Sequence, residues 1–133
     1  MAAKKTLFAY VSGTEHSDAV VKAVETKLDA LVAERKWTSK DVWVVNQKEP
    51  PYWDLGVNVA VPTGKALSPA FLDDAVAIAD ALASIHDEVK RSFVIGIADG
   101  DATADLLFID SAKPEVERLK TELRRALKMA DPI

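Results

Sequence analysis

Strand-like and helix-like hydrophobic patterns follow one another along this 133-residue chain in the order β-α-β-β-α-β-β-α. We expect strands at 6–11, 42–45, 55–61, 93–98 and 106–109, and helices at about 18–35, 68–89 and from 114 onward. The first six elements have the split βαβ order of ferredoxin-like folds. The prediction is one α+β domain spanning 1–133. It has a single antiparallel or mixed sheet of five strands and three helices, in which a C-terminal strand and helix extend a ferredoxin-like core.

Residues at the expected boundaries support this division. Ser17 and Ser68 are suitable N-caps, and Pro69 suits the first helical turn, where a backbone N–H donor is not needed. The segment 55–61 alternates apolar residues with small or polar ones, as a strand with one buried face does.

Two segments are interpreted as connections. We expect 46–54 to be a loop, because Pro50 and Pro51 cannot donate the hydrogen bonds of a strand ladder. The segment 99–105 is expected to be the turn of a hairpin between the last two strands.

The remaining strands are apolar on both sides, so each face of the sheet should need cover. The side chains that require it are Phe8, Tyr10, Trp43, Val45 and Phe108. We expect the last helix or a second subunit to cover the second face, because large apolar patches are rarely left open on monomers. A homodimer is therefore one alternative. A more parallel sheet, with the first two strands paired directly, is the rival topology.

Composition limits the class of protein. The net charge is −4 with acids and bases interspersed, whereas a nucleic-acid binder normally carries a basic stripe. No apolar run approaches the roughly 20 residues of a membrane span, and we expect neither a nucleic-acid nor a membrane partner. The chain has no cysteine and no recognisable signal peptide, and we expect a cytoplasmic location.

The strongest candidate site is the aromatic segment Pro50, Pro51, Tyr52, Trp53 and Asp54. Tyr and Trp are enriched at binding hot spots, and the prolines would stiffen the segment. We predict that it binds a protein partner, and that Trp53→Ala would abolish the interaction with little loss of stability. The alternative is that Trp53 folds back to cap the edge of the core.

A weaker ligand site is predicted from Ser12, Thr14, His16 and Lys65. Ser12 and Thr14 flank a glycine between a strand and a helix, which is where many α/β proteins bind ligands. Lys65 precedes the second helix, whose free N–H groups could hold an anion, although a plain turn is the alternative. His16 adjoins Ser17 and an acid, but sequence neighbours seldom form a catalytic relay, and a surface capping role is the alternative.

The sequence predicts no metal, no cofactor and no catalytic residue. Asp99, Asp101, Asp105 and Asp110 are spaced somewhat like calcium ligands, but Ala104 stands where a calcium loop requires glycine. We interpret this segment as a solvated hairpin tip. His86 is expected to be a half-buried packing residue.

These observations favour a non-enzymatic protein–protein interaction module of a regulatory, adaptor or inhibitor type, such as an immunity protein. Two alternatives stay open. One is a small-molecule-binding sensory domain with a pocket between sheet and helix. The other is a small enzyme that uses His16 or a carboxylate as its general base.

Overall fold

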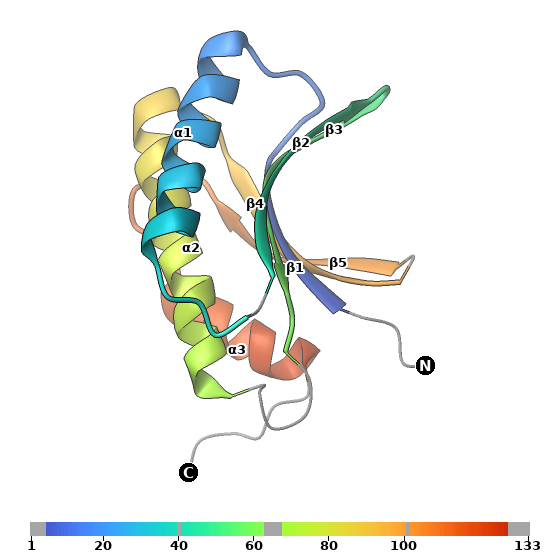
Figure 1. Cartoon of the computed structure of the whole chain (residues 1–133), viewed down its shortest axis with the longest axis vertical. Helices are drawn as coiled ribbons and strands as arrows, with labels where there is room; N and C mark the ends of the chain where they lie inside the picture. Colours follow the sequence, from blue (N-terminus) through green and yellow to red (C-terminus); the bar gives the residue numbers. More distant parts are fainter. Residues whose placement is uncertain (1–4, 40, 63–67, 101, 128–133) are drawn as a thin grey trace.

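The computed structural model describes residues 5–39, 41–62, 68–100 and 102–127, which form one sheet backed by helices (Figure 1). The strands are β1 (Lys5–Val11), β2 (Val42–Glu49), β3 (Tyr52–Ala60), β4 (Phe93–Asp99) and β5 (Ala102–Ile109). The helices are α1 (Asp18–Glu34), α2 (Pro69–Val89) and α3 (Val116–Ala126). The predicted element order and the α+β class are confirmed.

The sheet has the strand order β2-β3-β1-β4-β5, and every pair of neighbours is antiparallel. The first strand is therefore central, with Thr6 opposite Ala60 of β3 and Lys5 opposite Asp99 of β4. The rival topology is wrong, because β3 lies between β1 and β2.

The expected loop at 46–54 is instead the end of a β-hairpin. Lys48 pairs with Trp53 and Glu49 with Tyr52, so Pro50 and Pro51 occupy the two turn positions. A turn residue needs no ladder N–H, which is why two prolines are compatible with strands on both sides. The second hairpin also has a shorter turn than expected, since Asp99 already pairs with Ala102.

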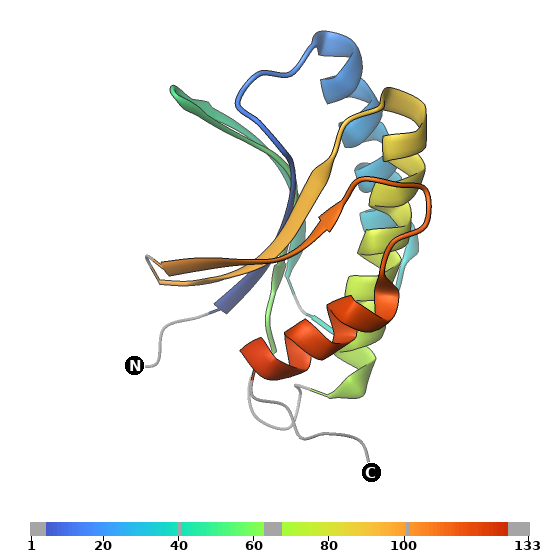
Figure 2. The ribbon, with the colours of Figure 1, turned by 180° about the vertical axis from the view of Figure 1, so that it is seen from behind.

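All three helices lie on one face of the sheet, as the opposite views of Figures 1 and 2 show. Helix α1 packs on β2 and β3, α2 packs between α1 and α3, and α3 packs on β5. The core between helices and sheet contains alternate residues of the strands, such as Leu7, Val57 and Ile95.

The expectation that the last helix covers the second face is wrong. Leu119, Leu123 and Leu127 form one buried stripe on α3, and this stripe joins the same core as Leu107 and Ile109 of β5. The opposite side of the sheet, called here the open face, is covered by no described part of the chain (Figure 2).

A buried carboxylate ties the end of α1 to α2. The side chain of Asp74 is 1% exposed, and its Oδ1 accepts hydrogen bonds from Arg35 Nε at 3.2 Å and Nη2 at 3.0 Å. Its Oδ2 accepts from the Thr38 backbone N–H at 2.9 Å and from the Thr38 hydroxyl. Asp74 thus connects α2 to the residues that follow α1 through the hydrogen bonds of its buried carboxylate.

Candidate functional site

The pairing register determines which side chains lie on the open face, because side chains alternate along each strand. One cross-strand row runs through Trp43, Asn58, Phe8, Gly96 and Asp105. The next row contains Val45, Gly56, Tyr10, Val94 and Phe108. Asp54 and Tyr52 extend β3 on the same face toward the hairpin turn.

Aromatic side chains dominate this surface. Trp43 is 44% exposed, Tyr52 69% and Phe108 60%. The rings of Phe8 and Tyr10 lie between them, with centroids 5.2 Å apart. Phe8 is buried yet does not belong to the core under the helices. The open face therefore holds a second apolar surface that no helix shields.

The charges of the open face are all acidic among the described residues. They belong to Glu49, Asp54 and Asp105, which are exposed. In the described part of the chain none of these carboxylates pairs with a lysine or arginine. The result is an aromatic surface with unneutralised negative charge.

A hollow of about 550 Å³ lies in the middle of the open face. Phe8, Tyr10, Asn58, Asp54 and Asp105 are among its lining residues. The Tyr10 hydroxyl donates a 2.6 Å hydrogen bond to Asn58 Oδ1. Burial raises the pKa of Tyr10, and the negative charge of Asp54 adds to that rise while the Asn58 hydrogen bond opposes it. Tyr10 therefore faces a hollow on the open face.

The structure brings two predicted sites together, because the β2–β3 hairpin tip lies against the loop between β1 and α1. The Trp53 indole lies 4.8 Å from the His16 ring, and Lys48 Nζ lies 4.7 Å from the indole on a cation–π contact. Trp53 also donates from Nε1 to Asn46 Oδ1 at 2.7 Å. Trp53 thus folds back onto its own chain, whereas Tyr52 and Asp54 point to the open face.

His16 is buried, and its partner is an arginine. Arg91 Nη2 donates to His16 Nδ1 at 3.1 Å and to the Ser12 carbonyl at 2.8 Å. Burial lowers the pKa of His16, and the Arg91 charge lowers it further. Because arginine can only donate, Nδ1 is the acceptor in this contact and the ring proton is assigned to Nε2, which has no hydrogen-bond partner among the described residues. The expected surface position of His16 is wrong, because the Trp53 hairpin covers the ring.

The residues near His16 do not form a catalytic relay. Ser17 Oγ accepts a hydrogen bond from the Val20 backbone N–H and caps α1, as predicted. Thr14 lies apart from Ser12 in a groove of about 270 Å³ beside the hairpin tip. Lys65 falls outside the described residues. His86 is half-buried, as expected, with Nδ1 2.8 Å from the Arg91 carbonyl oxygen.

Within the described ranges, no group of three histidine or carboxylate side chains is placed to hold a metal ion. Asp101, one member of the calcium-like spacing, lies outside those ranges. None of the described helices combines the length and hydrophobicity needed to cross a membrane.

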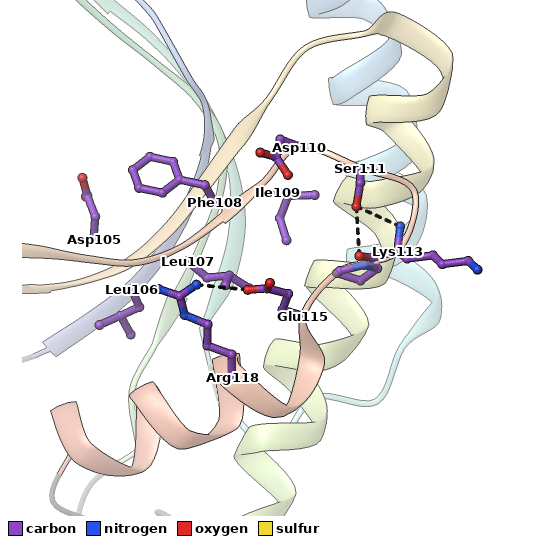
Figure 3. A pocket seen from close by; sticks show the side chains of 11 residues that line it. Asp105, Leu106, Leu107, Phe108, Ile109, Asp110, Ser111, Lys113, Glu115 and Arg118 are labelled. Atoms are coloured by element: carbon purple, nitrogen blue, oxygen red, sulfur yellow. Dashed lines mark hydrogen bonds and ion pairs between the residues drawn. The ribbon is translucent and has the colours of Figure 1, made fainter.

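A second groove, of about 350 Å³, runs between β5 and α3 (Figure 3). Some of its polar groups are engaged with one another. Arg118 pairs with Glu115 at 3.2 Å, and the Ser111 hydroxyl bonds to the backbone of Lys113. Asp105 and Phe108 also line this groove, so it adjoins the open face along β5 (Figure 3). The Arg118–Glu115 pair neutralises charge in the β5–α3 groove, whereas no ion pair is formed by the carboxylates of the open face among the described residues.

Comparison of the chain with models of known families, with curated proteins and with solved structures gave no match. The candidate site therefore has to be judged on its own geometry. Sequence reasoning singled out Tyr52 and Asp54 but did not connect them with Asp105, Asn58 or Phe8. The sequence signal for this site was that most strands are apolar on both sides. That pattern indicated a second apolar surface, but not which acidic residues lie on it.

Proposed function

We propose that this protein is a non-enzymatic protein–protein interaction module that binds a basic surface of a partner on its open face. A regulatory, adaptor or inhibitor role fits this activity. One observation carries the proposal: the open face combines exposed aromatic rings with exclusively acidic charge among the described residues. Aromatic side chains supply most of the binding energy at hot spots, and complementary charge selects the partner.

A second copy of the chain suits this surface less well. A twofold dimer through the open face would bring the same patch of both subunits together. Among the described residues, the patch of the second copy would offer only carboxylates to Glu49, Asp54 and Asp105, and like charges across an interface are unfavourable. A partner with lysine or arginine residues would neutralise them.

The proposal includes two finer assignments. The split βαβ order, with α1 and α2 on one face, supports a ferredoxin-like core extended by β5 and α3. A cytoplasmic location is our prediction from the cysteine-free composition.

Site-specific photo-crosslinking in the source organism tests the binding surface. A benzophenone amino acid replaces Trp43 or Phe108 on the open face, and Asp29 or Asp80 on the helices as controls. We expect a crosslinked protein from the two open-face positions only, attached through a segment rich in lysine and arginine. Charge reversal by Asp105→Lys should reduce the yield, whereas the matched reversal Asp29→Lys should not.

Four results would overturn the proposal. They are no crosslinked partner at the open face, crosslinks between copies of this chain alone, equal yields from both faces, or attachment to a segment without basic residues. Thermal melting of each variant must show a folded protein before its crosslinks are compared.

A further inference from the structure

The hollow on the open face combines aromatic rings with two carboxylates. Its volume of about 550 Å³ falls inside the range of ordinary ligand pockets. Phe8 and Tyr10 supply its aromatic surface, and Asp54 and Asp105 enter from β3 and β5 on opposite sides of β1.

The aromatic floor is held in place by a close approach of the backbone. A Cβ atom at Gly96 would lie 2.5 Å from Phe8 Cζ, so the Phe8 ring occupies the space above that glycine. The Phe8 and Tyr10 rings are tilted by 32° and pack against each other. The partly exposed Tyr10 ring, supported by the buried Phe8 ring, therefore offers a flat cation a stacking surface that is already formed before binding.

The charged groups of the hollow are both acceptors. The carboxylates of Asp54 and Asp105 can only accept when ionised. Tyr10 uses its proton in the hydrogen bond to Asn58, which leaves the phenol oxygen as a further acceptor. A ligand that matches these groups donates hydrogen bonds and carries positive charge.

We propose that the hollow binds the guanidinium group of an arginine side chain presented by a polypeptide. Guanidinium is planar, stacks on aromatic rings, and offers five N–H donors without any acceptor. This inference rests on the proposed function, because it names the side chain by which the basic partner would be anchored. Tyr10, supported by Phe8, receives the plane of the group, and Asp54 and Asp105 receive its charge.

The test uses a blocked amino acid as its probe. N-acetyl-arginine N-methylamide is titrated into the ¹⁵N-labelled full-length protein, and the amide signals of Phe8, Tyr10, Asn58 and Asp105 are followed. The citrulline analogue has nearly the same shape without the charge, and the lysine analogue has the charge without the plane. We expect saturable shifts with arginine and roughly tenfold weaker binding of citrulline, the change that one charged hydrogen bond produces. We expect lysine to bind more weakly than arginine as well.

Matched substitutions assign the effect to the hollow. Asp54→Asn and Asp105→Asn should each weaken arginine binding by roughly threefold, because both carboxylates are exposed and solvent screens them. Asp29→Asn on α1 makes the same charge change and should have no effect. Equal binding of citrulline or lysine, shifts confined to other residues, or insensitivity to both substitutions would overturn the inference.

The two proposals can fail separately. If the arginine probe does not bind but Trp43 crosslinks to a basic partner, only the arginine pocket is refuted. If the probe binds in the hollow but no partner crosslinks to the open face, the pocket holds and the interaction module is refuted.

Discussion

The buried carboxylate of Asp74 gives the sharpest prediction about stability. Its neighbour Asp73 is exposed, so the two residues form a matched pair one position apart on the same helix. We expect Asp74→Ala to destabilise the protein strongly and Asp73→Ala to change the free energy of unfolding by no more than about 0.5 kcal/mol.

The magnitude follows from the partners that Asp74→Ala would leave behind. Removing one member of a buried ion pair typically costs about 3–5 kcal/mol. The side chain of Arg35 is 30% exposed, and Thr38 is exposed, so water can satisfy part of what is lost. We therefore expect a loss of roughly 2–4 kcal/mol, a large share of the roughly 5–15 kcal/mol of a typical domain.

Urea and thermal unfolding of the two variants provide the measurement. For a chain of this length the predicted loss corresponds to a fall in Tm on the order of 10 °C. A double-mutant cycle with Arg35→Met isolates the coupling between Arg35 and Asp74. If Asp74→Ala were no more destabilising than Asp73→Ala, the anchoring role of this carboxylate would be refuted.

Three further predictions concern the hairpins and the buried histidine. Because the pKa of His16 is lowered in the folded protein, the unfolded state takes up this proton first as the pH falls. The contribution of His16 to stability is therefore complete above pH ~6.5 and decreases below it. His16→Gln should flatten this decrease in urea midpoints measured from pH 8 to 5. Gly96→Ala should lower the free energy of unfolding by about 3 kcal/mol, because the added Cβ would lie 2.4 Å from the Ala104 carbonyl oxygen. Equal stability of this variant and the wild type in urea would contradict the tight packing. Trp53→Ala should lower the free energy of unfolding by about 2 kcal/mol, because the contacts with His16 and Lys48 are lost. Tyr52→Ala should change it by no more than about 0.5 kcal/mol, because Tyr52 is exposed. The reverse order in thermal unfolding would show that Trp53 is not a packing residue.

Sequence reasoning was most successful where a pattern is local. The alternation from 55 to 61 predicted a strand with one buried face, and β3 has that character in Leu55, Val57 and Val59. Ser17 was recognised as the cap of α1 because capping needs only neighbouring residues. Pro50 and Pro51 led to the wrong prediction of a loop at 46–54. A proline destabilises a strand where its missing N–H would join the ladder, but not where it occupies a turn position.

The open face could not be predicted because it depends on contacts between distant elements. The stripe of Leu119, Leu123 and Leu127 shows that α3 is amphipathic, but not which side of the sheet it covers. The irregular pairing between Ile95 and Gly96 also shifts the alternation of β5, which places Asp105 and Phe108 on one face although they are three positions apart. Only the register shows that Asp105 lies on the same face of the sheet as Asp54 and Tyr10.

The central position of β1 has a consequence for how the protein is made. This strand is synthesised before both of its neighbours, β3 and β4, and its last partner in β4 is Asp99. At roughly 5–20 residues per second, the ribosome needs about 5–20 s to add the chain between these strands. During that time the apolar side chains of β1 lack the strand that flanks them on one side. Nascent chains that end before β4 should therefore depend on chaperones. The sheet should be completed only after β4 and β5 have left the ribosome.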